Sequence, residues 1–527
     1  MENKRKTLCL PYLLIGAVLT GLTLVFPQIG FLEWLTMIPL FIGAYRLAGR
    51  SRYGLGKTYL YGFLTVYAYY FVVYHWITYL YPLDFVGLDS LSSIAVVIVG
   101  WLGLPLLQAI PGGLVFLLFK LMHRTEVFRR VPLLRPFAFS ALWVVFEWSS
   151  TLGWTGVPWG RLCLGQAECL PMLQSASLFG SYFVSFLLLL VNGLLAYVIL
   201  YHKRVHRVVI CSALAVILIV ANYVGGTLLI NTSTPVSDTL RVAVVQGNIN
   251  SHEKWSSESL SVTKSAYGKM TRQAAAEGAE LVVWPETTFP YLFNRNSGLQ
   301  DYASALAREC NVTLVVGALY EDDFGKEYNA LYLIYPDGTI EESIYAKRHL
   351  VPFGEYVPMR EVFTALIPPL ANMTTLEDDL MPGTDTALFD TEWGKIGSLI
   401  CFDSIYEELA FDSARDGAAL LLLSTNDSWF LDSAAVYQHE AQAMLRAIEN
   451  GRYLVRSGNT GISTVITEKG EHLVWIEPLV EGYAVADVEM IEHNTLYTVI
   501  GNSFVYVCMG FSALLLILGV FLRKKRG

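Results

Sequence analysis

The stretch Lys395–Asp403, with the sequence KIGSLICFD, is an apolar run that ends in a cysteine, an aromatic residue and a carboxylate. Because its apolar residues are nearly continuous rather than alternating, the run predicts a β-strand that is buried on both faces. In layered α/β domains, reactive groups collect at the carboxyl ends of such strands, where loops replace packed side chains. Cys401 therefore lies where a nucleophile is expected, although a lone cysteine at a strand end is more often a structural core residue.

Runs of the same kind occur on both sides of this strand. They cover residues 241–246 (RVAVVQ), 280–286 (ELVVWPE), 313–320 (TLVVGALY), 330–336 (ALYLIYP) and 419–425 (ALLLLST). Helical patterns separate these runs, at about 257–277, 298–310, 404–415 and 433–450. The alternation predicts a layered α/β domain within residues 238–495.

Two more polar residues lie at or just beyond predicted strand ends. Glu286 follows LVVWP, and Lys347 lies in SIYAKRHLVPFGEY. Taken singly, Glu286 would be explained as a helix cap after Pro285, and Lys347 as one of many solvated lysines. Together with Cys401 they supply what acyl chemistry on a thiol requires: a base for the thiol proton, a cation for the thiolate and the oxyanion, and the nucleophile itself.

The rest of the chain has the composition of a membrane protein. Of 527 residues, 54% are hydrophobic and 16% are charged, which is outside the range of ordinary soluble proteins. A helix needs about 20 apolar residues to cross about 30 Å of hydrocarbon. Eight runs fit or approach this length: 8–26, 29–48, 58–81, 91–119, 136–150, 174–200, 208–230 and 499–522. We therefore expect a membrane domain with seven transmembrane helices in 1–237, and an eighth helix with a basic tail in 496–527.

The basic residues predict the orientation of these helices. Outside residues 238–495 the chain has 20 Lys or Arg, and 19 of them fall in five clusters. Between any two of these clusters the chain makes an even number of predicted membrane crossings, so all five clusters lie on the same side. Only Arg161 lies elsewhere. Because Lys and Arg concentrate in cytoplasmic loops, we expect both termini inside the cell and residues 238–495 outside the cytoplasm.

Charge and cysteine usage exclude several classes of function. Residues 238–495 carry 39 Asp or Glu and 17 Lys or Arg, a net charge of −22, and such an acidic domain is a poor match for nucleic acid. The nine histidines show no HExxH motif and no paired Cys/His spacing, so we expect no metal and no cofactor. The seven cysteines form no dense disulfide framework; Cys163 and Cys169 are close enough in sequence to pair, but burial of both is as good an explanation.

The motifs WPET, KRHLVPFGEYVP and LICFD resemble, in order and spacing, the Glu-Lys-Cys motifs of the nitrilase superfamily, whose fold is an α-β-β-α sandwich. Further matches are QGNI (246–249) and STNDSWF (424–430). A nitrilase-like domain between a seventh and an eighth membrane span, with QH (438–439) and RSGNTGIS (457–464), is similar to the apolipoprotein N-acyltransferase family of bacteria. The similarity is strong in 240–470, whereas in the spans it rests on topology.

The resemblance implies roles for particular residues. Cys401 would attack an ester carbonyl and carry the acyl chain as a thioester, with Glu286 as general base. Lys347 would favour the thiolate and the oxyanion, helped by the backbone N–H of Phe402. Glu355 matches a second family glutamate that supports the site, and it would equally serve as a structural partner for Lys347.

The resemblance also implies the substrates and the location. The acyl donor would be a membrane phospholipid, and the acceptor a diacylglyceryl-modified apolipoprotein, at the outer face of a bacterial inner membrane; we expect a monomer. Trp255, Trp429 and Asn426 are candidate substrate-binding residues, although aromatic packing would explain the tryptophans nearly as well. The segment 357–382 is too apolar for a solvated loop and is interpreted as an arm that reaches towards lipid.

One departure from the family and two other classes of function remain. The transferases commonly have Tyr-Glu after the nucleophile, where this chain has Phe402-Asp403, which affects donor selectivity and oxyanion geometry. A membrane-tethered amidase would use the same triad with water as acceptor. A transporter or receptor is disfavoured because Glu33 and Glu147, nearly the only acidic residues in the spans, have no evident cationic partner and are expected at the membrane interface.

Overall fold

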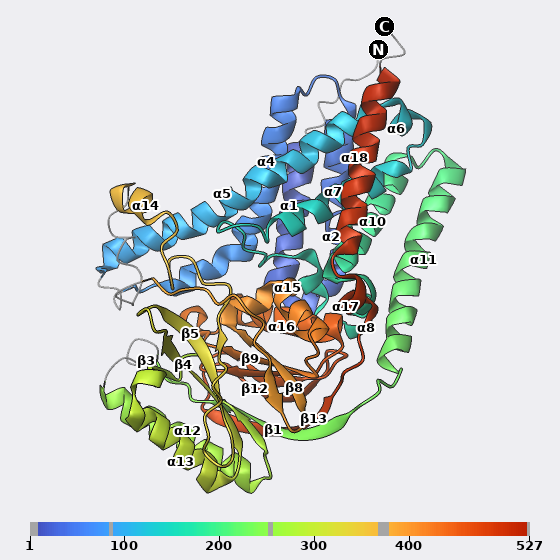
Figure 1. Ribbon diagram of the computed structural model, residues 1–527. Coiled ribbons are helices and arrows are strands. Elements are labelled where there is room, and N and C mark those ends of the chain that lie inside the picture. Colours follow the sequence, from blue (N-terminus) through green and yellow to red (C-terminus); the bar gives the residue numbers. More distant parts are fainter. Residues whose placement is uncertain (1–8, 84–87, 251–256, 367–378, 524–527) are drawn as a thin grey trace. The chain divides into compact units, whose positions relative to one another are not determined.

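The computed structural model describes residues 9–83, 88–250, 257–366 and 379–523, which form two compact units (Figure 1). One unit, called the helical unit here, comprises residues 1–78, 98–232 and 500–527. The other, called the sandwich, comprises residues 79–97 and 233–499.

The sandwich contains two β-sheets. In the first, the strand order is β13-β1-β2-β4-β5-β6, with β3 paired to β4. Strands β1, β2 and β4 are parallel to one another, and β13, β5 and β6 extend this core by antiparallel pairing. The bounds are β13 (Gly482–Met490), β1 (Asp238–Gln246), β2 (Leu281–Val283), β3 (Phe289–Leu292), β4 (Thr313–Glu321), β5 (Glu327–Ile334) and β6 (Tyr345–Ala346).

The second sheet has the order β12-β11-β10-β9-β8-β7. Its centre is parallel, because β9 pairs in parallel with both β8 and β10. The bounds are β12 (His472–Ile476), β11 (Ser463–Ile466), β10 (Leu454–Gly458), β9 (Leu420–Thr425), β8 (Gly394–Ile400) and β7 (Phe389–Thr391). Parallel neighbours bring their carboxyl ends to one edge, where the loops that follow β8 and β9 lie together.

Alternate residues of one strand enter two different layers of the core. Val242 and Val244 of β1 join a cluster with Ile396 and Leu420 of the second sheet, so they lie between the sheets. Ala243 packs instead with the helices that cover the outer face of the first sheet. Strands buried on both faces have no polar side, which is why their sequences are continuously apolar.

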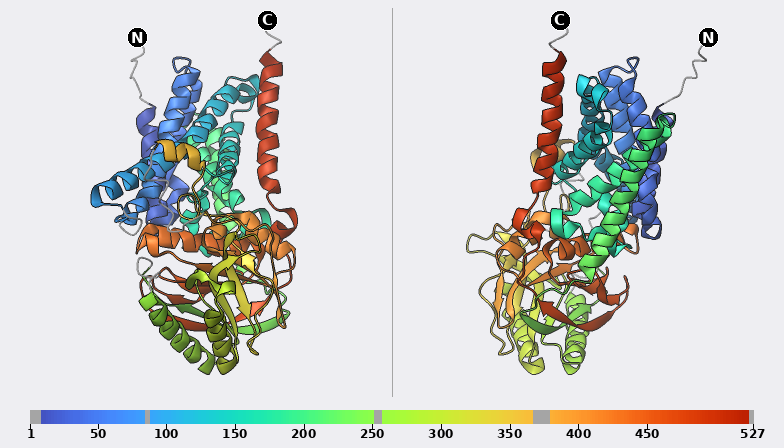
Figure 2. Two further views of the ribbon diagram at one scale, coloured as in Figure 1. Left: turned by 60° about the vertical axis from the view of Figure 1, so that its left-hand side comes forward. Right: turned by 90° about the vertical axis from the view of Figure 1, so that its right-hand side faces the viewer.

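Helices cover both outer faces of the sandwich (Figure 2). Helices α12 (Ser257–Ala276) and α13 (Ser297–Cys310) share a core cluster with the first sheet. Helices α15 (Glu407–Arg415) and α16 (Ala434–Asn450) pack on β8 and β10 of the second sheet. The predicted α-β-β-α sandwich is thereby confirmed, and all four predicted helical stretches contain a helix.

Each of the eight apolar runs overlaps at least one helix. The bounds are α1 (Leu10–Val25), α2 (Glu33–Thr36), α3 (Ile38–Gly49), α4 (Leu55–Val73), α5 (Ser90–His123), α7 (Leu134–Ser149), α10 (Ser181–Leu200), α11 (Val205–Ile230) and α18 (Ser503–Arg523). Within the residues that the structure describes, four segments are long and apolar enough to cross a membrane: 27–49, 90–123, 181–200 and 205–230. Two shorter apolar helices lie at Leu10–Val25 and Ser503–Gly519. The chain is a membrane protein.

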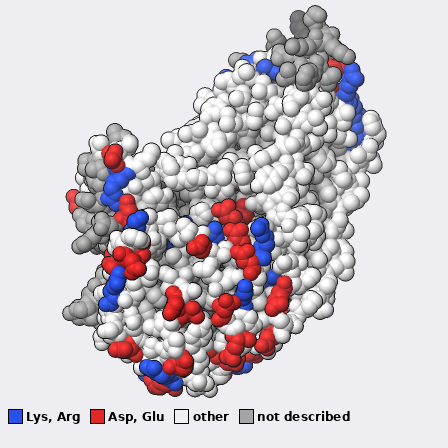
Figure 3. Space-filling view, viewed as in Figure 1, with Lys and Arg blue, Asp and Glu red and all other residues white. Residues whose placement is uncertain are grey.

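Charged side chains distinguish the surfaces of the two units. On the face shown in Figure 3, the helical unit is largely uncharged, whereas acidic side chains are spread across the sandwich. Large apolar residues of the helical unit are exposed, such as Val205, Ile217 and Leu228 at 60% or more. Exposed apolar helix surface of this extent matches a hydrocarbon environment.

The expected interface exposure of Glu33 and Glu147 is wrong. Their exposed fractions are 0% and 2%, inside the helical unit. Glu33 accepts a hydrogen bond from Gln166, and Glu147 accepts from the indole of Trp143 and the backbone N–H of Leu162. Uncharged hydrogen-bond donors from neighbouring segments therefore replace water around these two carboxyl groups. The apolar sequence around each glutamate does not indicate whether the side chain lies at the interface or inside the unit.

No disulfide joins Cys163 and Cys169 in the structure. Cys163 is fully buried, and Cys169 is partly buried. Of the two explanations that the sequence left open, the structure favours burial without pairing.

Candidate active site

Cys401 begins a short 3₁₀ turn, Cys401–Ile405, directly after β8. Its φ angle is +48°, in the left-handed region that a residue with a β-carbon rarely adopts. Such a conformation costs about 1–3 kcal/mol and persists where the surroundings hold it. Two bonds in the turn do so: Asp403 Oδ2 accepts from the N–H of Ile400 at 3.0 Å, and Ser404 Oγ donates to the Cys401 carbonyl at 2.9 Å.

Lys347 follows β6 and is only 1% exposed. Its Nζ lies 2.9 Å from Oε1 of Glu286, which follows β2, and 2.9 Å from Oε2 of Glu355. Burial alone would lower the pKa of Lys347, but the two carboxylates outweigh it and raise the pKa well above the usual value. Lys347 is therefore a permanent buried cation, as the sequence-based role requires.

Asn329 connects the two carboxylates of this cluster. From β5, its Nδ2 donates to Oε1 of Glu286 at 2.7 Å and to Oε1 of Glu355 at 2.9 Å. Asn329 was not predicted as a site residue. The only signal was a polar residue just before the apolar end of the strand EYNALYLI, which does not reveal what the side chain contacts.

The thiol of Cys401 is electrostatically coupled to this cluster. Burial raises the pKa of Cys401 far above its usual value, and the charge of Glu286 raises it further, while Lys347 opposes the shift. Glu286 and Lys347 follow strands of the first sheet and Cys401 follows a strand of the second, yet the charges of the first two residues act on the thiol of the third. Because the pKa is raised, the resting group is a neutral thiol, and attack on a carbonyl would require a base to remove its proton.

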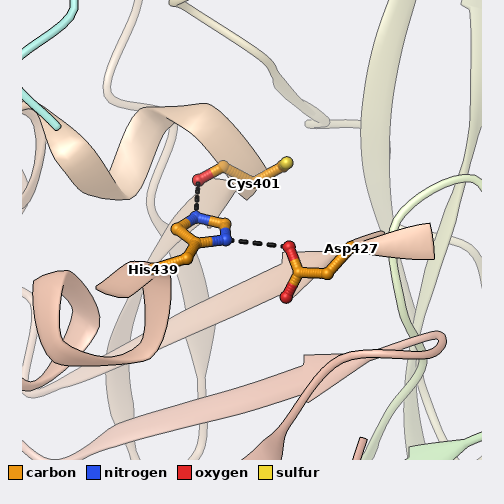
Figure 4. Close-up of side chains that lie close together, drawn as sticks. All are labelled: Cys401, Asp427 and His439. Carbon is orange, nitrogen blue, oxygen red and sulfur yellow. Dashed lines mark hydrogen bonds and ion pairs between the residues drawn. The ribbon is translucent and has the colours of Figure 1, made fainter. Parts of the chain in front are cut away.

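A second cluster of buried side chains contacts the Cys401 turn, and Figure 4 shows two of its members beside Cys401. It contains Asp427 after β9, His439 on α16 and Arg456 on β10, each no more than 1% exposed. Nδ1 of His439 is 2.8 Å from Asp427 Oδ1, and Nε2 is 3.1 Å from the carbonyl oxygen of Cys401. The sequence analysis quoted QH as a family match but gave His439 no role.

This cluster contains the donor types of a metal site. Suitable atoms of Cys401, Asp427 and His439 all lie within 4.8 Å of one another. However, both imidazole nitrogens already engage in hydrogen bonds, and the sulfur points away from the ring in Figure 4. Arg456 Nη2 also donates to Asp427 Oδ2 at 2.6 Å. A buried cation beside the carboxylate disfavours a metal ion, so we assign none.

The remaining predicted residues are placed as follows. Phe402 is 8% exposed and lies edge-on to Tyr406. Asn426 and Trp429 are partly buried in the loop after β9, and Asn426 Oδ1 accepts from Asn459 Nδ2 at 3.1 Å. Trp255 lies outside the described residues. Substrate binding by Trp255, Asn426 and Trp429 stays a prediction.

Comparison with known proteins gives matches in both units. Residues 241–505 match the carbon-nitrogen hydrolase family, and residues 16–194 match the apolipoprotein N-acyltransferase N-terminal domain. The apolipoprotein N-acyltransferase of Geobacter metallireducens is 33% identical over 97% of this chain and 95% of that protein. That of Gloeobacter violaceus is 31% identical over 96% of this chain and 94% of that protein.

Among solved structures, the sandwich matches Saccharomyces cerevisiae Nit3, a member of branch 10 of the nitrilase superfamily. The identity is 22% and the TM-score 0.38, over 49% of this chain and 93% of that one.

Proposed function

The chain belongs to the apolipoprotein N-acyltransferase family, and we propose that it transfers an acyl chain from a membrane phospholipid to the α-amine of the N-terminal diacylglyceryl-cysteine of apolipoproteins. One observation carries the proposal. A thiol at the end of β8 is electrostatically coupled to a buried Lys347–Glu286 ion pair, in a chain whose other unit consists of apolar helices. The proposed catalytic residues are Glu286, Lys347 and Cys401.

The first half-reaction forms a thioester. Glu286 takes the proton of the Cys401 thiol as the sulfur attacks the ester carbonyl carbon of the phospholipid. The carbonyl oxygen becomes an oxyanion, which Lys347 and the backbone N–H of Phe402 stabilise. When the tetrahedral intermediate collapses, the ester C–O bond breaks, and the lysophospholipid leaves as an alcohol with the proton that Glu286 held.

The second half-reaction moves the acyl chain to nitrogen. The α-amine of the acceptor attacks the thioester carbonyl, and Glu286 accepts one amine proton. The C–S bond breaks, the sulfur regains a proton, and an amide forms. The same base and the same oxyanion donors thus act twice, as expected for covalent catalysis with two similar acyl transfers.

The helical unit favours a lipid-linked acceptor over water. An amidase that uses water needs no membrane-embedded part. Two substrates anchored in a bilayer, by contrast, reach a site at the membrane with a high effective concentration and restricted orientation.

The arm that the sequence predicts lies partly outside the described residues. The described part contains the helix Arg360–Leu366 and two exposed apolar side chains, Met359 at 51% and Val362 at 48%. Exposed apolar side chains on a short surface helix match contact with lipid. We retain the arm as part of the proposal.

The proposed location is the bacterial inner membrane, with the sandwich on the extracytoplasmic side. Of 20 basic residues outside 238–495, 19 lie in the clusters expected to be cytoplasmic. Apolipoproteins and phospholipid would meet the site at that outer surface.

Mass spectrometry of the purified protein tests the function. After incubation with phospholipid, we expect an acyl adduct on Cys401. The adduct should disappear, with amide formation, when a diacylglyceryl-cysteine peptide is added, and Cys401→Ala is the matched control. Release of free fatty acid at the same rate with and without the peptide would instead identify an amidase-type hydrolase.

A further inference from the structure

Two side chains lie within hydrogen-bonding distance of the Cys401 carbonyl oxygen. Ser404 Oγ lies 2.9 Å from this carbonyl oxygen, and His439 Nε2 lies 3.1 Å from it. The same imidazole nitrogen is 2.9 Å from Ser404 Oγ. A fully buried histidine therefore contacts both the nucleophile residue and the turn that follows it.

Three neighbours fix the orientation of the imidazole. Asp427 Oδ1 is 2.8 Å from Nδ1, and Arg456 Nη2 donates to Asp427 Oδ2 at 2.6 Å. Thr425 Oγ1 also donates to Asp427 Oδ1, at 3.2 Å. Burial would raise the pKa of Asp427, but His439 and Arg456 lower it to about 2. As an ionised carboxylate it can only accept, so it takes the Nδ1–H of the ring. For Nε2 to donate to the Cys401 carbonyl as well, the imidazole must carry both N–H protons, with Asp427 as its counter-charge.

The geometry of the peptide bond connects this contact to the oxyanion. The carbonyl of Cys401 and the N–H of Phe402 belong to one planar peptide unit, and in a trans peptide they point in opposite directions. A donor that fixes the carbonyl therefore also fixes the direction of the N–H. The left-handed φ of Cys401 makes such support necessary, because this conformation is not the one that the residue prefers.

We propose that His439, oriented by Asp427 and Arg456, is a positioning residue that holds the Cys401 carbonyl and so aims the Phe402 N–H at the oxyanion. The inference rests on the proposed acyl transfer. His439 does not take the thiol proton in this arrangement, because its Nε2 faces the carbonyl and the Ser404 hydroxyl, and the sulfur points away from the ring (Figure 4).

Two amide variants of His439 test the roles of its two ring nitrogens separately. The side-chain nitrogen of Gln reaches about as far as Nε2 of histidine, so His439→Gln keeps a donor for the Cys401 carbonyl. The nitrogen of Asn reaches only as far as Nδ1, so His439→Asn keeps the bond to Asp427 and loses the one to Cys401. We expect His439→Asn to slow acylation of Cys401 by about 10- to 100-fold, somewhat less than the loss of a whole oxyanion donor. His439→Gln should stay within about threefold of the wild type.

The assay has two acyl donors and one reagent that forms no oxyanion. The donors are phospholipid and a short p-nitrophenyl ester, which acylates a thiol without the natural donor. Iodoacetamide alkylates the thiol by displacement at a saturated carbon, so its rate should stay within about twofold in both variants. Ser404→Ala removes the other side-chain contact to the same carbonyl and should slow acylation a few-fold. This variant still tests the proposal if His439→Asn fails to fold. Thermal unfolding of each variant identifies such failure.

The outcomes distinguish this inference from the proposed function. If p-nitrophenyl ester acylation depends on His439 but phospholipid is not a donor for the wild type, the positioning role stands and the proposed function falls. Equal slowing of alkylation and acylation, or equal loss in the Gln and Asn variants, would overturn the positioning role. A wild-type Cys401 that reacts with neither ester would overturn both.

Discussion

The backbone N–H of His349 donates a 2.8 Å hydrogen bond to Oδ1 of Asp403. The other oxygen of Asp403 accepts from the hydroxyl of Tyr345 at 2.9 Å and from the N–H of Ile400 at 3.0 Å. Tyr345 and His349 flank Lys347, while Ile400 precedes Cys401. A single buried carboxylate thus connects the segment that carries the cation with the turn that carries the thiol, and the short stem of aspartate suffices for these three hydrogen bonds.

Replacing Asp403 by Asn should weaken both segments together. Asparagine has one acceptor and one donor group where two acceptors are needed, so a buried donor would face another donor. We expect unfolding to be easier by about 1–3 kcal/mol and acylation of Cys401 to slow. Thermal unfolding and the rate of acyl-enzyme formation measure the two effects. Asp412→Asn, which removes a partly exposed partner of Arg348, is the control, and equal effects in the two variants would contradict the assignment.

Continuous apolar runs in the sequence predicted the layers of the fold, but they did not predict several of the strands. Strand β10, LVRSG, contains a buried arginine, and β6 has only two residues. Strand β12 has mostly exposed side chains. Their pairing depends on neighbours distant in the chain, such as Leu454 opposite Leu421, and a local pattern cannot indicate such a neighbour.

The same limit applies to the site. Glu286, Lys347, Glu355 and Cys401 could be named because each lies in a motif with family spacing. Asn329 and Arg456 are polar residues within strands and lie outside these motifs, and they matter because the fold brings them to carboxylates 43 and 29 residues away. Their roles depend on burial, and the local sequence does not indicate whether a polar side chain is buried.

Cys401→Ser should fold but form no stable acyl adduct. At neutral pH a hydroxyl is a far weaker nucleophile than a thiol, and the surrounding groups are positioned to activate a thiol. Mass spectrometry after incubation with phospholipid measures the adduct. Cys310→Ser is the matched control, since Cys310 is a partly buried free cysteine at the end of α13, and it should acylate normally. An adduct that survives in Cys401→Ser and vanishes in Cys310→Ser would show that the wrong thiol has been named.

Alkylation of Cys401 should keep rising with pH. Only the thiolate reacts, and burial together with the charge of Glu286 raises the pKa of Cys401 far above its usual value. Below that pKa the thiolate fraction grows about tenfold per pH unit, so the iodoacetamide rate should climb from pH 7 to pH 9 without a plateau. Lys347→Met should lower the rate at every pH, because Lys347 opposes the raised pKa. A plateau below pH 9 in the wild type would mean that the thiol ionises more easily than its surroundings indicate.

Reporter fusions test the orientation. A reporter that is active only outside the cytoplasm should be active when fused at about residue 300 and inactive when fused near Lys203 or at the carboxyl terminus. The physical reason is the retention of Lys and Arg clusters on the cytoplasmic side. Activity of a cytoplasmic reporter at residue 300 would reverse the topology, and the sandwich could not then meet exported apolipoproteins.

Glu286 and Lys347 have different roles in the proposed acylation of Cys401, as base and as cation. Glu286→Gln keeps the size of the side chain and much of its hydrogen bonding but cannot accept a proton, so acylation and transfer should each slow by about 10²–10⁴-fold. Lys347→Met leaves the base in place and removes the cation near the oxyanion, a loss of about 3–4 kcal/mol by comparison with an oxyanion-hole donor. In the structure these side chains form one buried ion pair with Nζ 2.9 Å from Oε1. Lys347→Met therefore leaves the Glu286 carboxylate without its cation, whereas in Glu286→Gln the Lys347 ammonium keeps Glu355 as its partner.

The double variant Glu286→Gln/Lys347→Met should therefore lose much less activity than the product of the single losses, because groups that act as a unit are not additive. Single-turnover acylation of the three variants measures this, with Asn329→Asp as a comparison that adds charge to the same cluster while leaving both residues in place. Losses that multiply fully would show that Glu286 and Lys347 act independently. Near-normal acylation in Glu286→Gln would remove that residue from the role of base, and the proton of the Cys401 thiol would then need another acceptor within reach of the sulfur.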